Sequence, residues 1–114
     1  MAEVVYKKLA NGVIVINGPE RLTSDSSDDY KKLLSALVDD GNFNIVIDLS
    51  ATVYMDSRGL GAIVSKISVL RSNNGDIRIT GINTQIRQLL EITHLNQILK
   101  SYPDLPTAVN SFKE

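Results

Sequence analysis

Two unbroken runs of β-branched residues constrain the fold of this chain more than any other feature. Val13 to Ile16 form one run, and Ile45-Val46-Ile47 form the other, inside the stretch "FNIVIDLS" from Phe43 to Ser50. A strand with one solvated face alternates apolar and polar residues, whereas a continuous apolar strand is covered on both faces. The runs therefore predict two buried strands, of which the second is central in its sheet.

Helical patterns follow the strands. In "GPERLTSDSSDDYKKLLSALVDDG", a Ser and Asp cluster can cap a helix that ends before Gly41. Its buried face is expected at Leu33, Leu34, Leu37 and Val38. A second helix is expected over residues 57–72, and a third in "NTQIRQLLEITH" with Asn83 or Thr84 as cap. A short terminal helix is expected in "LPTAVNSF", where Pro106 suits the first turn.

The remaining segments complete an alternating pattern. Asn11-Gly12 predicts a hairpin between the first two strands, because both residues tolerate positive φ. "DIRIT" reads as a short alternating strand, and "NQILKSY" as a last edge strand. Strands that alternate with helices predict an α/β domain with a mixed sheet, and residues 1–114 are expected to form one domain.

Composition excludes several classes of function. A formal net charge of −1 argues against nucleic-acid binding through bulk electrostatics. The absence of cysteine excludes disulfides and thiolate metal sites. The start "AEVVYKK" is unlike a signal peptide, and no apolar run approaches the length of a membrane span. We therefore expect a cytoplasmic protein without a membrane partner, and we predict no metal site and no cofactor.

The segment "VYMDSRGLGAI", residues 53–63, begins the second expected helix. Asp56 is a good N-cap, because its carboxylate can accept from the free amides of Arg58 or Gly59 and oppose the helix dipole. On this interpretation Ser57 lies in the first turn, and the glycines allow close packing against the sheet.

Capping leaves one feature of this helix unexplained. At about 100° per residue, a stripe of small residues lies beside the apolar face of this helix. A helix surface that only needs to be soluble would carry long polar side chains there, because these are better helix formers. The small residues are Ser57, Gly61, Ser65, Ser68 and Ser72. We interpret this small-residue stripe as a docking surface with Ser57 at its head, and a chance run of serines is the alternative.

Catalytic and nucleotide-binding motifs fit the segment poorly. A nucleophile elbow needs a glycine two residues before the serine, and Tyr54-Met55 supplies none. A serine nucleophile also needs a base, and His94 is the one histidine in the chain. A phosphate-binding Walker loop would place lysine after the last glycine, and a dinucleotide fingerprint would add a third glycine. A small hydrolase is therefore disfavoured, and no catalytic residue is predicted.

The stretch "FNIVIDLSATVYMDSRGLGAIV" resembles the signature of STAS domains, in particular the bacterial anti-sigma factor antagonists. That signature is a strand ending in Asp-Leu-Ser, a short loop, and Asp-Ser-x-Gly-Leu-Gly at the start of a helix. "IRITGINTQIRQLLEITHLNQIL" and "YPDLPTAVNSF" are similar to the rest of the family's domain. The resemblance implies a mixed sheet of four or five strands, with about four helices packed mainly on one side.

The resemblance also implies a non-enzymatic, phosphorylation-controlled protein-binding switch. In the family, the serine after the motif aspartate is phosphorylated by an ATP-dependent anti-sigma factor serine kinase, and this serine corresponds to Ser57. The unmodified antagonist binds that kinase-like anti-sigma factor and frees the sigma factor, and a PP2C-type phosphatase reverses the modification. We expect a monomer or weak dimer whose partner-binding residues are Asp56, Ser57, Arg58, Gly59, Gly61, Ser65 and Thr23.

Two departures from the family pattern bear on partner choice. Thr23 stands where an aspartate is expected, after a lengthened loop, and Arg58 stands where a small residue is frequent. STAS modules also serve in stress-signalling scaffolds, secretion regulators and lipid-transport complexes, and such a role is the alternative function. The serine in the Asp56-Ser57 pair favours the phosphorylation switch.

Overall fold

The computed structural model describes residues 5–112. Within this range the strands are Tyr6–Lys8 (β1), Ile14–Asn17 (β2), Arg21–Leu22 (β3), Asn44–Asp48 (β4), Tyr54–Met55 (β5), Asp76–Thr80 (β6) and Lys100–Tyr102 (β7). The helices are Ser27–Asp39 (α1), Ser57–Val64 (α2), Ile67–Ser72 (α3), Thr84–Ile92 (α4) and Leu105–Asn110 (α5), with a 3-10 turn at Leu95–Gln97 (η1).

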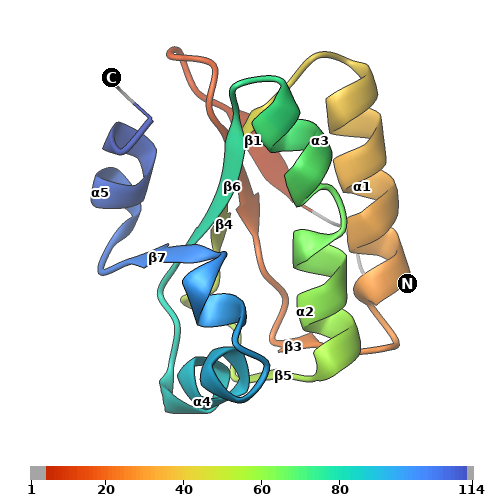
Figure 1. Ribbon diagram of the computed structural model, residues 1–114, viewed down its shortest axis with the longest axis vertical. Helices are drawn as coiled ribbons and strands as arrows, with labels where there is room; N and C mark the ends of the chain where they lie inside the picture. Colours follow the sequence, from red (N-terminus) through yellow and green to blue (C-terminus); the bar gives the residue numbers. More distant parts are fainter. Residues whose placement is uncertain (1–4, 113–114) are drawn as a thin grey trace.

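The main sheet has five strands in the order β1-β2-β4-β6-β7 (Figure 1). β1 pairs antiparallel with β2, and the other neighbours pair parallel, so the sheet is mixed as predicted. β4 lies in the middle, which confirms the prediction from its apolar run. The hairpin before β2 also forms, and Gly12 adopts a φ of 90° in its turn, a conformation that glycine allows at little cost.

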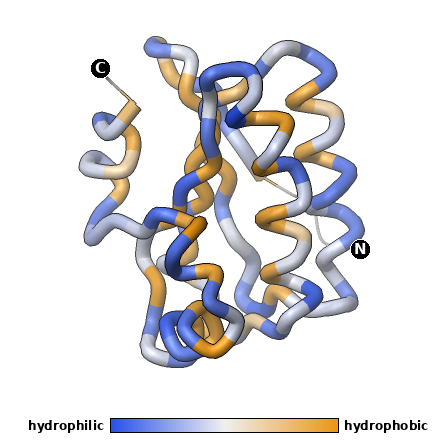
Figure 2. The backbone as a smooth tube through the Cα atoms, in the orientation of Figure 1, coloured by the Kyte–Doolittle hydropathy of each residue, from blue (hydrophilic) through white to orange (hydrophobic). Residues whose placement is uncertain are grey.

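Both faces of the central strands are buried. Ile45 and Ile47 of β4 face a large apolar cluster to which α1, α2, α3 and α4 contribute, whereas Val46 packs on the opposite face with Val13 and Ala108. Helices thus lie mainly on one side, with α5 covering the other (Figure 1). Figure 2 shows how hydrophobic and hydrophilic positions follow one another along α1 and α2, as expected for helices with one buried face.

The prediction of a single helix over residues 57–72 is wrong, because the chain forms α2 and α3 with a break between them. The Ser65 hydroxyl donates to the carbonyl oxygen of Ala62 at 2.8 Å, and Lys66 leaves the helical region with φ −116° and ψ 14°. A serine that bonds back to the preceding turn competes with the helical backbone bonds. Ser68 and Ser72 therefore belong to a separate helix, and the small-residue stripe is not continuous.

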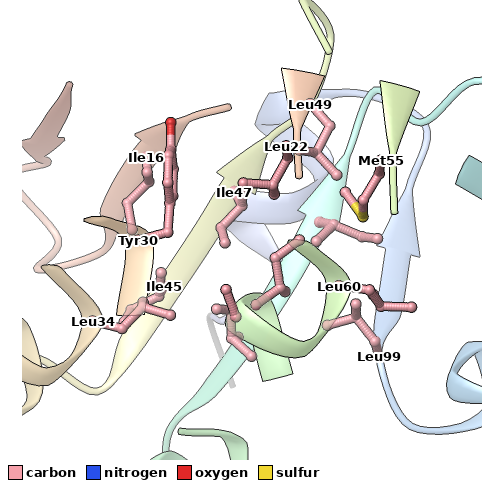
Figure 3. Packing of buried hydrophobic residues seen from close by; sticks show 14 of the residues in the cluster. Ile16, Leu22, Tyr30, Leu34, Ile45, Ile47, Leu49, Met55, Leu60 and Leu99 are labelled. Atoms are coloured by element: carbon pink, nitrogen blue, oxygen red, sulfur yellow. The ribbon is translucent and has the colours of Figure 1, made fainter. Parts of the chain in front are cut away.

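Two expectations about strands also need correction. The two-stranded parallel sheet of β3 and β5 was not expected, and it buries Leu22 and Met55 in the core beside Ile47 and Leu49 (Figure 3). β6 does not alternate, since four of its five residues are buried and Arg78 is half-buried. The Arg78 guanidinium is held by the buried Asp76 carboxylate at 3.1 Å and lies 4.2 Å from the centroid of the Phe112 ring.

Candidate functional site

Ser57 is the first residue of α2 and its side chain is exposed to solvent. Asp56 caps this helix, because its Oδ1 accepts from the backbone N–H of Gly59 at 2.8 Å. The capping predicted for Asp56 is therefore confirmed, with Gly59 as the donor. The arrangement presents the serine hydroxyl at the positive end of a helix dipole, outside the core.

Asp56 also joins two loops that are distant in the sequence. Its Oδ2 accepts from the backbone N–H of Ser24 at 3.3 Å. Thr23, the neighbour of Ser24, is half-buried, and its carbonyl oxygen accepts from the N–H groups of Ser26 and Ser27 at 3.0 and 2.8 Å. The loop that carries Thr23 thus lies beside the Asp56-Ser57 pair, and it leads directly into α1.

The start of α1 differs from the expected capping by a serine side chain. Ser26 occupies the N-cap position, but its side chain makes no capping bond to the helix. Its hydroxyl donates to the carbonyl oxygen of Arg21 at 3.1 Å instead and stabilises the preceding turn. Ser27 is buried. The first turn of α1 is acidic, because Asp28 and Asp29 lie near the positive end of the helix.

The two glycines of the motif have different surroundings. Gly59 is buried, and a Cβ on it would overlap the backbone carbonyl of Leu22. Gly59 thus packs against β3 of the same chain, and its contact with a partner stays a prediction. A Cβ on Gly61 would have open space around it, so packing does not require a glycine there. Gly61 is partly exposed, and its place in a docking surface stays a prediction.

Other predicted partner residues lie on the same helix. Arg58 and Ser65 are exposed. The described residues 5–112 form two salt bridges, both to Asp76, so Arg58 has no carboxylate partner among them. Arg58, Gly61 and Ser65 therefore extend the accessible surface that begins at Ser57.

An aromatic and cationic pair next to Ser57 was missed in the sequence. The guanidinium of Arg21 lies 4.8 Å from the ring centroid of Tyr54, because β3 and β5 place these residues opposite each other. Tyr54 is 37% exposed, so the pair is accessible from solvent. A guanidinium is attracted to the face of a tyrosine ring, and arginine and tyrosine are each enriched in protein interfaces. No local pattern links the two positions, since the pairing depends on the small sheet.

Contacts from α4 to β5 were missed as well. Asn83 caps α4 as predicted, accepting from the N–H of Ile86 at 2.9 Å, and its amide also reaches the carbonyl oxygen of Val53 at 3.0 Å. Gln85 bonds to both backbone groups of Met55. These side chains hold the strand that leads into Ser57.

Residues 5–112 hold no cluster of three or more histidine or carboxylate side chains suited to a metal ion. His94 follows the end of α4 in a left-handed conformation with φ 62°. A groove of about 380 Å³ lies between α4 and β7, lined by residues that include Arg87, Leu99 and Tyr102, and none of the predicted site residues lines it. Among the described helices, none has the length and apolarity that a bilayer crossing requires.

Comparison with known proteins agrees with this architecture. The anti-sigma-B factor antagonist of Staphylococcus aureus is 32% identical over 71 residues, which cover 62% of this chain and 66% of that protein, just under two thirds of its length. An anti-sigma factor antagonist from Mycobacterium paratuberculosis has a similar structure, with a TM-score of 0.86 and 21% identity over 98% of this chain and 94% of its own.

A second solved structure extends the likeness to nearly the full length of both chains. The anti-sigma-factor antagonist (STAS) domain protein of Planctomyces limnophilus superposes with a TM-score of 0.88 and 17% identity, covering 99% of this chain and 100% of that one. At such identities the likeness concerns the fold. The family profile of the STAS domain matches residues 5–108. The chain therefore belongs to the STAS domain family.

Proposed function

We propose that this STAS domain is an anti-sigma factor antagonist that works by phosphorylation-controlled partner switching. In its unmodified form it binds an anti-sigma factor serine kinase, and it releases that partner when Ser57 carries a phosphate. The observation that supports this most directly is the exposed Ser57 side chain at the head of α2, beside an aspartate that caps the helix. The domain itself catalyses no reaction in this scheme.

The fold is expected to tolerate a phosphate at this position. A phosphoserine adds about −1.5 to −2 charges and three acceptor oxygens. At the N-terminus of α2 these face free backbone N–H groups and the positive end of the dipole, which favour an anion. The switch must therefore act on the complex rather than on the stability of the free domain.

A charge on Ser57 would weaken a close interface strongly. Two like unit charges about 4 Å apart repel by about 4 kcal/mol at an effective dielectric constant of 20. A loss of this size lowers affinity about a thousandfold. A bulky dianion at the head of the surface formed by Ser57, Gly61 and Ser65 also prevents close approach of another backbone.

The other predicted residues act around this serine. Asp56 keeps the N-terminus of α2 in place and contacts the partner, and Arg58 forms part of the rim. Thr23 lies in the adjoining loop and bears on partner choice, because it replaces an acidic residue of the family pattern. A PP2C-type phosphatase would restore the binding form, and the protein would act in the cytoplasm as a monomer or weak dimer.

Phosphate transfer tests this proposal. The protein is incubated with Mg-ATP and each serine kinase of the anti-sigma factor class from its own organism, and products are separated on a phosphate-affinity gel. We expect a mobility shift for the wild type and for Ser68→Ala, which removes another exposed serine, and no shift for Ser57→Ala. A shift that persists in Ser57→Ala would contradict the assignment of the site.

Binding to the same kinases tests the switch itself. Calorimetry with Mg-ADP should show that Ser57→Ala binds like the wild type, whereas Ser57→Asp binds at least about a hundredfold more weakly. Equal affinity for both variants would refute switching by charge. If no kinase binds or modifies the wild type, a STAS interaction role in a signalling scaffold or a secretion or lipid-transport complex becomes the better reading.

A further inference from the structure

The outer edge of β5 is closed by a side chain rather than by another strand. Gln85 of α4 accepts from the backbone N–H of Met55 at its Oε1, 3.0 Å away, and its Nε2 donates to the carbonyl oxygen of Met55 at 2.8 Å. One side-chain amide thus satisfies both backbone groups, as a residue of an antiparallel strand does in a hydrogen-bonded pair. These two bonds span 30 positions of sequence.

Asn83 adds contacts to the residues just before β5. Its Nδ2 donates to the carbonyl oxygens of Val53 at 3.0 Å and Thr52 at 3.4 Å, while its Oδ1 caps α4. The same side chain therefore fixes the start of α4 and holds the loop before β5. We call Asn83 and Gln85 the amide clamp.

The opposite edge of this segment is held by β3 and its flanks. The N–H of Val53 donates to the carbonyl oxygen of Glu20 at 2.8 Å, and the N–H of Asp56 donates to that of Leu22 at 3.2 Å. Residues 52–56 consequently lie between β3 and the amide clamp. Ser57 follows directly, so its position depends on both edges.

Met55 makes the clamp necessary. Its side chain is fully buried in the core, so its backbone cannot turn toward water without removing the side chain from its packing. Buried backbone groups without partners are strongly disfavoured. If the Gln85 amide is removed, β5 must therefore shift to rehydrate these groups, and Asp56 and Ser57 shift with it.

We propose that Gln85, supported by Asn83, is a positioning residue for Ser57: it holds β5 so that the start of α2 is presented in the geometry that the kinase recognises. The part of this inference that concerns the kinase rests on the proposed function. When only a fraction of molecules is competent to bind, the apparent affinity falls by that fraction, whereas the rate from the bound complex does not change. Loss of the clamp should therefore raise KM and leave kcat unaltered.

The test compares two glutamines of one helix. Gln85→Met keeps the length of the side chain and removes both hydrogen bonds, and Gln88→Met makes the same change at an exposed position of α4. Hydrogen exchange of the full-length protein is followed by NMR. We expect the amides of Val53, Met55 and Asp56 to exchange at least tenfold faster in Gln85→Met, while those of β4 stay as in the wild type and Gln88→Met changes neither group.

A second variant tests the clamp without touching Gln85. Asn83→Asp retains an oxygen that caps α4 and loses the donor to the carbonyl oxygen of Val53, so the fold is preserved. The same three amides should lose protection, by a smaller factor. Unchanged protection in both variants would overturn the inference, whether or not Ser57 is ever phosphorylated.

Phosphorylation kinetics supply the second readout. With a kinase that modifies the wild type, Gln85→Met should raise KM about tenfold at constant kcat, and Gln88→Met should match the wild type. Wild-type KM in Gln85→Met would overturn the role in recognition. If no kinase modifies the wild type but exchange is still accelerated in Gln85→Met, the proposed function fails while the clamp on β5 stands.

Discussion

The backbone carbonyl of Leu22 occupies the space that a side chain on Gly59 would need. β3 and the first turn of α2 therefore touch backbone to backbone, two residues after Ser57. Gly61, two residues on, has open space where its Cβ would be. Packing thus requires only the first of the two motif glycines.

The two glycines should respond in opposite ways to alanine. Gly59→Ala forces β3 and α2 apart and should lower the free energy of unfolding by about 3 kcal/mol. Gly61→Ala removes a poor helix former from an uncrowded position and should raise it by up to about 1 kcal/mol. Urea unfolding measures both. If Gly61 serves docking, Gly61→Ala should bind the kinase more weakly although it is more stable, and equal binding would remove Gly61 from the surface.

Substitutions at Asp56 should separate the contributions of its two hydrogen bonds to stability. Asp56→Ala loses the cap on Gly59 and the bond from Ser24, and should cost at least about 1 kcal/mol of unfolding free energy. Asp56→Asn can still cap the helix with its carbonyl oxygen, so it should cost less. Thermal unfolding followed by circular dichroism ranks the two variants, and an equal loss in both would show that the cap on Gly59 contributes nothing to stability.

Tyr30 should make stability depend on pH in the alkaline range. Burial, followed by the nearby Asp29 carboxylate, raises the pKa of Tyr30 to about 12, and its hydroxyl donates to the carbonyl oxygen of Asn17 at 2.9 Å. The unfolded chain releases this proton near pH 10 and the folded chain near 12. Between these pH values the unfolded state therefore binds fewer protons than the folded state. The contribution of Tyr30 to the free energy of unfolding is complete below pH 10 and is lost as pH rises toward 12.

Tyr30→Phe checks this expectation. Urea unfolding should show a loss of about 1 kcal/mol at pH 8 from the missing hydrogen bond. The difference in free energy of unfolding between Tyr30→Phe and the wild type should then narrow between pH 10 and 12. Tyr6→Phe, at an exposed tyrosine, is the control and should leave the curve unchanged. A difference that stays constant across this range would mean that Tyr30 titrates normally.

Asp76 should be the most sensitive charged residue of the sheet. Its buried carboxylate holds Arg71 at 3.0 Å and Arg78 at 3.1 Å, and these side chains are 41% and 14% exposed. Asp76→Ala leaves the less exposed Arg78 guanidinium without its counter-ion and should cost about 3 kcal/mol of unfolding free energy. Arg71→Met should cost much less, because that side chain is better solvated. Chemical denaturation compares the variants, and equal costs would contradict the role of burial.

His94 should store backbone strain. It is exposed and adopts φ 62°, where a side chain is disfavoured and glycine is not. His94→Gly should therefore raise the free energy of unfolding by about 1 kcal/mol. His94→Ala keeps the Cβ and should gain nothing, so a similar gain in both variants would point to the imidazole rather than the backbone.

The sequence alone determined the elements whose signals are local. The run Ile45-Val46-Ile47 predicted a central strand, because a strand buried on both faces has no polar alternation to display. Asp56 was identified as a helix cap and Asn83 as one of two candidates, because a cap and the amide that it accepts from lie three residues apart. The family signature around Ser57 is likewise contiguous, so the fold class and the proposed site could be read before any coordinates.

Tertiary structure decided how that site is held. The overlap of Gly59 with Leu22, the bond from Ser24 to Asp56 and the clamp of Gln85 on Met55 have no signature in the order of residues. All three are contacts between segments about 30 or more positions apart, formed only once the sheet brings β3, β5 and α4 together. Periodicity and capping act within a few residues, whereas the close approach of two backbones depends on how all the layers pack.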